Sequence, residues 1–170
     1  MPLRPELERL YHEHAPSLFG FLLNLTRDES DTRDVLQELF LKLARRPDRL
    51  GGVRNPRAFL LRLAHNLAID LIRRRSTRQK NTDQFAAEPP ALFAPSADPD
   101  ESTFRAALER ALGELPAEQR AVMHLKLWEG MTFEAIAETL EIPANTAASR
   151  YRYGLDKLRQ LLRPLYEEIK

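Results

Sequence analysis

The sequence predicts an all-α protein with two small helical domains joined by an extended, proline-containing linker. Apolar residues recur at helical spacing on both sides of the middle of the chain, and no segment alternates apolar and polar residues as a half-buried strand does. Only 6 of the 170 residues are glycine and 8% are aromatic, which argues against a β-sandwich or barrel with its many turns. We expect the domains at residues 1–75 and 104–170, with the linker at residues 76–103.

The composition excludes several classes of protein. With 43% hydrophobic and 30% charged residues, the chain can fold and should be soluble. It has no cysteine, which excludes a disulfide framework, a thiolate metal site and a cysteine nucleophile. No apolar run approaches membrane-spanning length, and the first 25 residues lack the core of a signal peptide. We therefore expect a cytoplasmic protein without membrane insertion.

The net charge of +1 conceals an uneven distribution. Residues 1–75 carry a net charge of +4 and residues 76–103 a net charge of −3, while residues 104–170 are neutral overall. The acidic middle segment shows neither a helical nor a strand period and contains four prolines, Pro89, Pro90, Pro95 and Pro99. Prolines fix φ and remove hydrogen-bond donors, so this segment is typical of an extended linker. Fully stretched, it could reach about 90 Å.

The first expected helix spans residues 5–27, although Pro16 should kink or split it. Its apolar stripe is Leu7, Leu10, Tyr11, Leu18, Phe19, Leu22 and Leu25. The second expected helix begins at Ser30 or Asp31, both good N-caps, and ends near Arg45. Beside its apolar face it carries a mixed stripe at i, i+3, i+4 and i+7, which is Asp34, Gln37, Glu38 and Leu41. Periodicity alone favours a solvated face with one exposed leucine, and the alternative is a surface that docks another helix.

The third expected helix opens with the cap Asn55 and with Pro56 at its first position, and it ends at Arg75. Its expected buried residues are Leu60, Leu63, Leu67 and Leu71. Its expected opposite face is Arg62, Asn66, Ile69, Asp70 and Arg73. An amide among cations, followed by three consecutive arginines, suits a phosphate backbone with one base edge to read. The alternative is a solvated helix whose terminal arginines favour the negative end of its dipole.

After the linker we expect four helices, at residues 104–112, 116–129, 132–140 and 143–162. The last two are separated by a short turn at residues 141–143, and the small Ala137 allows them to approach closely. This is the pattern of a helix-turn-helix, whose second helix presents its first residues to the major groove of DNA. The expected core of this motif is Ile136, Leu140, Ile142, Ala147 and Tyr151. The candidate DNA contacts are Asn145, Thr146, Ser149, Arg150 and Arg152.

No catalytic or metal-binding constellation is evident. His12 and His14 are two residues apart on a helix, so they point to different faces, and no carboxylate accompanies them in a ligand pattern. His65 and His124 fit ordinary packed or surface positions. Because a glycine-rich phosphate loop and a nucleophile motif are also missing, we expect no enzymatic activity, no metal and no cofactor.

Taken in order, these segments closely resemble bacterial RNA polymerase sigma factors of the extracytoplasmic-function (ECF) type. The run Asp34-Val-Leu-Gln-Glu-Leu-Phe resembles the family's region 2.2, and residues 56–75 resemble regions 2.3 and 2.4. Leu115-Pro-Ala-Glu-Gln-Arg and Glu129-Gly-Met-Thr-Phe-Glu-Ala-Ile-Ala-Glu-Thr-Leu resemble region 4, which is followed by its recognition helix. The resemblance covers both domains in the family's order.

The resemblance implies a function in transcription initiation. The stripe Asp34, Gln37, Glu38 and Leu41 would dock on the β′ coiled coil of core RNA polymerase, and region 4 would rest on the β flap. The minus-ten element would be held as a single strand by Leu50, Arg54, Arg57, Phe59, Arg62, His65, Asn66, Arg73 and Arg74. The minus-thirty-five element would be bound as duplex DNA by Asn145, Thr146, Ser149, Arg150, Arg152 and Tyr153. The acidic linker would thread the polymerase cleft, and an anti-sigma factor is implied as a further partner.

Two features depart from the family pattern. Phe59 stands where the family often has tryptophan. In the recognition helix, Ala148 and Tyr153 stand where a basic residue is usual, while Arg152 is basic one residue early. One alternative is therefore a sigma-like protein that binds core polymerase without normal minus-thirty-five selectivity. Another is a stand-alone helix-turn-helix regulator, which would leave residues 1–103 unexplained. No dimerisation helix is evident, so we expect a monomer when the protein is free.

Overall fold

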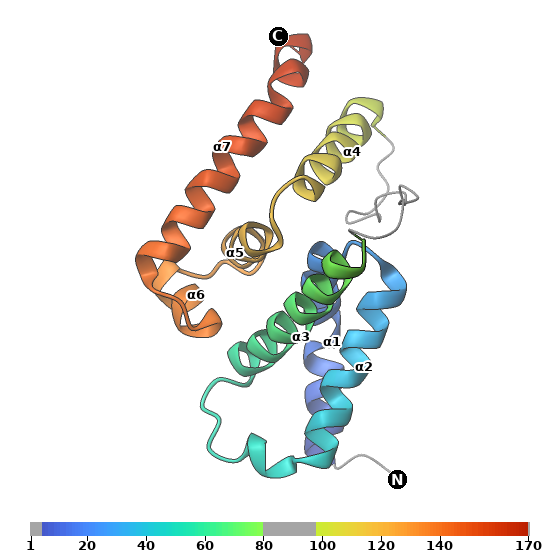
Figure 1. The fold of residues 1–170 in the computed structure, drawn as a ribbon, viewed down its shortest axis with the longest axis vertical. Coiled ribbons are helices and arrows are strands. Elements are labelled where there is room, and N and C mark those ends of the chain that lie inside the picture. Colours follow the sequence, from blue (N-terminus) through green and yellow to red (C-terminus); the bar gives the residue numbers. More distant parts are fainter. Residues whose placement is uncertain (1–4, 80–97, 170) are drawn as a thin grey trace. The chain divides into compact units, whose positions relative to one another are not determined.

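The computed structural model describes residues 5–79 and 98–169, and within these ranges every regular element is a helix. The chain divides into two compact units, Met1–Ala86 and Ala87–Lys170 (Figure 1). The predicted all-α class with two helical domains is therefore confirmed. No helix in the two described ranges is long and apolar enough to cross a membrane. The expected extended conformation of the central linker concerns residues 80–97, which lie outside the described residues.

The first unit contains α1 (Pro5–Thr26), α2 (Glu29–Arg45) and α3 (Pro56–Gln79), with the short 3-10 helix η1 (Pro47–Leu50) between α2 and α3. Helix α1 packs against both α2 and α3 (Figure 1). The fully buried side chains are Leu18, Phe21, Leu22, Leu25, Leu39, Leu43, Leu60 and Leu61. Of the two effects expected of Pro16, a split is excluded, because α1 is one continuous helix. Burying each leucine contributes about 1.5–3 kcal/mol, which together outweighs the roughly 3 kcal/mol that an internal proline costs.

Helix α2 begins earlier than the sequence predicts, because Asp28 is its N-cap and accepts a hydrogen bond from the backbone N–H of Asp31 at 2.9 Å. The expected caps Ser30 and Asp31 are inside the first turn. The side chain of Asp31 has another partner: its carboxylate is only 9% exposed and accepts two hydrogen bonds from the guanidinium of Arg75. The Arg75 Nη2–Asp31 Oδ1 distance is 2.6 Å. This ion pair ties the start of α2 to the end of α3.

Helix α3 has the predicted cap, since the Ala58 N–H donates to Asn55 Oδ1 at 3.1 Å, but its rotation differs from the prediction. The buried side chains are Leu60, Leu61, Ala64, Ala68 and Ile69, whereas Leu63, Leu67 and Leu71 are half-buried. Ile69 was expected on the outer face and is 6% exposed. The reason is the close approach of neighbouring helices, for which the small side chains Ala64 and Ala68 are better suited than leucine.

The second unit contains α4 (Pro99–Gly113), α5 (Ala117–Leu127), α6 (Phe133–Leu140) and α7 (Ala144–Ile169). Helix α4 begins five residues before the predicted start, because Asp98 caps it and Pro99 occupies the first helical position. Helix α3 likewise continues four residues past Arg75, and α7 continues past Leu162 through Pro164. Helical residues therefore occupy both ends of the segment expected as linker.

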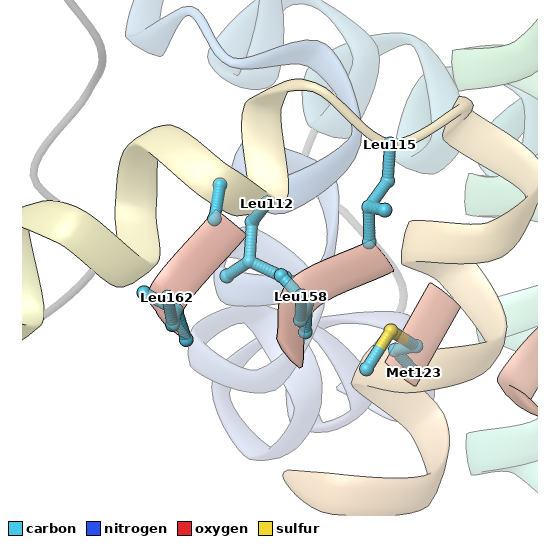
Figure 2. Packing of buried hydrophobic residues seen from close by; sticks show 6 residues of the cluster. Leu112, Leu115, Met123, Leu158 and Leu162 are labelled. Carbon is cyan, nitrogen blue, oxygen red and sulfur yellow. The ribbon is translucent and has the colours of Figure 1, made fainter. Parts of the chain in front are cut away.

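A leucine-rich cluster joins α4, α5 and α7 (Figure 2). Its labelled members are Leu112, Leu115, Met123, Leu158 and Leu162. At Gly154 helix α7 approaches α5 closely, since a Cβ atom there would lie 2.7 Å from the sulfur of Met123. His124 is also buried, and its ring stacks on that of Trp128 at 5.3 Å between centroids. Burial lowers the pKa of His124 to about 4, so this side chain is a neutral packing residue at pH 7.

We predict that Arg75→Ala lowers the free energy of unfolding by about 1–2 kcal/mol at pH 7, because the buried Asp31 carboxylate is left without the guanidinium that faces it. Burial raises the pKa of Asp31 and Arg75 opposes that rise, so the substitution raises the pKa further. A carboxyl group with a higher pKa in the folded than in the unfolded state destabilises the fold as the pH increases. The loss of stability should therefore shrink between pH 7 and pH 4.

Urea unfolding at both pH values measures this effect. Arg74→Ala is the matched control, because the Arg74–Asp70 pair is exposed on both sides and should contribute less than about 0.5 kcal/mol. Equal losses of stability for the two variants at pH 7 would contradict the assigned role of the Asp31–Arg75 pair.

Candidate functional site

The outer face of α2 gathers the four residues predicted to bind polymerase. Asp34, Gln37, Glu38 and Leu41 are all exposed and line one shallow hollow, together with Lys42 and Arg45. The opposite face of α2 is buried through Val35, Leu36, Leu39, Phe40 and Leu43. Because burial of that face fixes the rotation of α2, the mixed stripe is turned outward. Leu41 is 45% exposed, which leaves a large apolar side chain uncovered among charged neighbours.

An apolar groove adjoins this hollow and shares Gln37 and Leu41 with it. The groove has a volume of about 400 Å³ and is lined by Tyr11, Arg33, Leu36, Gln37, Phe40 and Leu41. The Tyr11 ring meets the Phe40 ring edge-on at 5.0 Å between centroids. Tyr11 was expected in the buried stripe of the first helix but is 39% exposed. Sequence reasoning missed Tyr11 and Arg33 here. The signal that could have found Tyr11 was an amphipathic tyrosine among leucines.

The residues predicted to bind the minus-ten element lie on α3 and on the loop before it. Phe59, Arg62, Asn66 and Arg73 follow helical spacing along one outer stripe of α3, with Asn66 and Arg73 exposed and the other two half-buried. On the loop, Arg54 is exposed and Leu50 is half-buried. Arg57 is half-buried in the first turn of α3. The outer stripe thus combines an amide and an aromatic ring with cations.

Two further candidates for the minus-ten element, His65 and Arg74, have different surroundings. The ring of His65 is turned inward, because its Nε2 atom is buried, and His65 Nδ1 lies 3.5 Å from Asn66 Oδ1. His65 therefore does not share the outer stripe. Arg74 is exposed, but it donates to Asp70 Oδ2 at 3.2 Å, so its charge is offset by a carboxylate one turn away.

The helix-turn-helix is built from three local features. Thr132 caps α6 by accepting from the Ala135 N–H at 3.1 Å. Glu141 ends α6 in the left-handed conformation at φ 58°, which costs a non-glycine residue about 1–2 kcal/mol. The chain then turns back, since the Ile142 N–H donates to the Ala137 carbonyl at 3.0 Å. Ile136, Leu140 and Ala147 are buried as predicted, while Ile142 and Tyr151 are half-buried.

The start of α7 presents most of the predicted minus-thirty-five residues. Asn145, Arg152 and Tyr153 are exposed, and Thr146, Ser149 and Arg150 are half-buried. Arg152 Nη2 lies 3.4 Å from the Ser149 hydroxyl oxygen. The two tyrosines of this helix differ: Tyr151 packs inward with its ring edge-on to Phe133 at 5.4 Å between centroids, whereas Tyr153 is 62% exposed. Tyr153 therefore occupies the outer face where a basic residue is usual.

Comparison with known proteins agrees with this two-part architecture. The family model for Sigma-70 region 2 matches residues 10–78, and the model for Sigma-70 region 4 matches residues 105–158. The chain is 36% identical to the ECF RNA polymerase sigma factor SigL of Mycobacterium tuberculosis, covering 94% of this chain and 90% of that protein. It is 32% identical to the RNA polymerase sigma factor CarQ of Myxococcus xanthus, covering 95% and 92% of the two chains.

A solved structure has the same fold. The sigma factor RpoE of Bartonella quintana, crystallised with the anti-sigma factor NepR, superimposes with a TM-score of 0.74 at 21% sequence identity. The match covers 94% of this chain and 98% of that one.

A helical region 2 followed by a helix-turn-helix region 4 defines a sigma factor of the Sigma-70 type. The chain belongs to the ECF RNA polymerase sigma factors, which bind core RNA polymerase and direct promoter recognition. A stand-alone helix-turn-helix regulator is thereby excluded, because the first unit is a matched sigma region.

We predict that Leu41→Ala weakens binding of the protein to core RNA polymerase by about tenfold. Burying a fully exposed leucine side chain contributes about 1.5–3 kcal/mol, and Leu41, which is 45% exposed, is the large apolar side chain of the outer face of α2. Fluorescence anisotropy with labelled protein and sigma-free core measures the affinity. Thermal unfolding is the control: an exposed side chain should leave stability within about 0.5 kcal/mol. Unchanged affinity would remove Leu41 from the interface.

Proposed function

We propose that this chain recruits core polymerase and recognises promoters through three separate surfaces. The outer face of α2 docks on the β′ coiled coil, the outer stripe of α3 with its preceding loop holds the minus-ten element, and the start of α7 binds the minus-thirty-five element. One observation carries the proposal. A single leucine core orients α2 and α3 so that an acidic and apolar stripe faces outward on one helix and an amide with arginines faces outward on the other.

The minus-ten surface has the chemistry that a single strand requires. Flipping one base out of the stack costs a few kcal/mol. Stacking on an aromatic ring recovers about 1–3 kcal/mol per base, and Phe59 offers such a ring. The exposed Asn66 can read a base edge, while Arg62 and Arg73 neutralise phosphates on the same stripe. The inward ring of His65 makes it a supporting residue of this surface and not a direct contact.

The minus-thirty-five surface has fewer cations than the family pattern. Ala148 and Tyr153 replace usually basic residues, and the salt dependence of duplex binding becomes shallower by about 0.9 for each phosphate that is no longer neutralised. Tyr153, which is exposed, can instead contact the methyl group of a thymine in the major groove. This observation also favours a second candidate function, a sigma-like protein that binds core polymerase with reduced minus-thirty-five selectivity.

The remaining parts of the proposal rest on family membership. Region 4 rests on the β flap, the linker threads the polymerase cleft, and the reaction is catalysed by the polymerase, so this chain supplies no catalytic group. The protein acts in the cytoplasm and is a monomer when free. An anti-sigma factor is a further partner, as it is for the RpoE protein of Bartonella quintana that shares this fold.

Run-off transcription tests the proposed function directly. Sigma-free bacterial core polymerase is incubated with fragmented genomic DNA, with and without the protein. New transcripts that start downstream of a shared two-part motif are the expected result. Transcripts from promoters that share only a minus-ten motif would support the second candidate function. Co-elution with core polymerase but no transcript would overturn promoter recognition, and the failure of both would overturn the sigma-factor proposal.

We predict that Arg150→Ala weakens binding of the holoenzyme to duplex minus-thirty-five DNA by about tenfold and lowers the salt slope by about 0.9, because the guanidinium no longer pairs with a phosphate or a base edge. Electrophoretic mobility shift at several salt concentrations measures both quantities. The matched control is Arg159→Ala, which removes an exposed arginine more than two turns further along α7. An Arg150→Ala protein with the affinity of the control would show that Arg150 does not contact this element.

A further inference from the structure

Arginines gather where α2 ends and the loop to α3 begins. Between residues 39 and 69 the sequence has seven cations and a single acidic residue, Asp48. Three of these cations, Arg45, Arg46 and Arg49, are exposed and lie in the last turn of α2 and in the turn that leads through η1. We call these three residues the arginine corner. None of them is among the residues assigned to polymerase, to the minus-ten element or to the minus-thirty-five element in the proposed function, although Arg45 borders the hollow on α2.

The backbone holds the arginine corner in a compact turn. The Arg46 N–H donates to the Lys42 carbonyl at 3.1 Å, and the Arg49 N–H donates to the Arg46 carbonyl at 3.0 Å. Arg46 Nε lies 3.5 Å from Asp48 Oδ1, with both side chains more than two-thirds exposed. Such an exposed pair contributes little energy, so a phosphate can replace Asp48 at low cost.

The arginine corner carries more positive charge than the dipole at the end of α2 accounts for. A cation in the last turn interacts favourably with the negative end of the helix dipole, and Lys42 and Arg45 already occupy that turn. Lys42 is further engaged by Glu38 at 3.6 Å. Arg46 and Arg49 lie beyond the last turn of α2, where the dipole no longer accounts for them. Their charge is therefore suited to a partner outside the helix.

The loop that follows is shaped for close approach. Gly51 and Gly52 come directly after η1, and Gly52 has a φ of +80°, which favours glycine. A Cβ atom at Gly52 would meet nothing within 4 Å, so the space beside this loop is open. Leu50, the last residue of η1, and Arg54 in this loop are proposed contacts of the minus-ten strand. A single strand held by this loop must leave it at one of the loop's two ends. The arginine corner lies at the end nearer α2.

We propose that the arginine corner binds the phosphates of the promoter single strand as it leaves the minus-ten surface, and so extends that surface by several nucleotides on the α2 side of the loop. This inference rests on the proposed function. Guanidinium groups pair with phosphate through two parallel hydrogen bonds, which favours arginine at such a site. A single strand is favoured over an acidic protein surface because the arginine corner is continuous, through Gly51 and Gly52, with the proposed base-binding loop.

The test uses full-length protein assembled with core polymerase and three fluorescent oligonucleotides. The first is the non-template minus-ten element of a promoter mapped by run-off transcription. The other two add six thymidines at its 5′ or its 3′ end. The variant is R46A/R49A, which leaves Arg45 in place because Arg45 lines the hollow proposed to dock polymerase, and the matched control R159A/R163A removes the same charge from exposed positions of α7. Anisotropy titrations at four salt concentrations give affinity and salt slope.

We expect one of the two extensions, and only one, to tighten binding to the wild-type holoenzyme. The R46A/R49A variant should lose that gain and lower the salt slope on the extended strand by about 1.4, at about 0.7 per neutralised phosphate of a single strand. Its binding to the unextended element should match that of wild type and of the control. Thermal unfolding verifies that the variant is folded.

Three results would overturn the inference. The gain from extension is absent in wild type, or the variant retains it, or both extensions tighten binding equally. In each of these cases the proposed function stands, provided that the wild-type holoenzyme binds the unextended element. Failure of the wild-type holoenzyme to bind that element would count against the proposed function itself. A variant that binds core polymerase more weakly would identify an acidic polymerase surface as the partner of the arginine corner instead of DNA.

Discussion

The leucine core contributed by α1 is the constraint on which the rest of the first unit depends. Helix α1 contacts both α2 and α3, and side chains such as Phe21 and Leu22 have no exposed surface. Each neighbouring helix can bury its apolar side in one rotation only, because interiors are close-packed. The outward faces follow from that rotation. The Asp31–Arg75 pair then fixes where the start of α2 lies against the end of α3. The surfaces proposed for polymerase and for DNA are therefore consequences of one packing arrangement.

Charge is divided along α2. Its four carboxylates, Glu29, Asp31, Asp34 and Glu38, precede Leu41, and apart from Arg33 its cations follow: Lys42 and Arg45 in the helix, then Arg46 and Arg49 in the turn. Carboxylates near the start of α2 and cations near its end both interact favourably with the helix dipole. The number of exposed charged residues is nevertheless larger than the dipole requires. The uncovered Leu41 lies between Asp34 and Glu38 on one side and Lys42 and Arg45 on the other, while the cations beyond α2 lead into the loop proposed to hold the minus-ten strand. One helix can thus present a mixed and partly apolar surface to a protein and a cationic end to a nucleic acid.

In the second unit, the close approach of helices likewise determines which residues face outward. Gly154 brings α7 against Met123 of α5, and a side chain at that position would collide with the methionine sulfur. The left-handed Glu141 sets the direction in which α7 leaves α6. These two backbone features orient the recognition helix, so that Tyr151 packs on Phe133 while Tyr153 faces outward. The replacement of a basic residue by tyrosine therefore concerns the outer surface of the helix and not its packing.

The sequence by itself determined the helices, the cap at Asn55 and the outward stripe of α2. Periodicity places Leu41 opposite the buried face, and the cap at Asn55 depends only on neighbouring residues, so local patterns suffice. Only the tertiary structure decided the rotation of α3, the inward ring of His65 and the partner of Arg75, which lies 44 residues away along the chain. Counting leucines favoured one face of α3, but close packing selected the face with Ala64 and Ala68. Such choices depend on contacts between distant segments, which no local pattern contains.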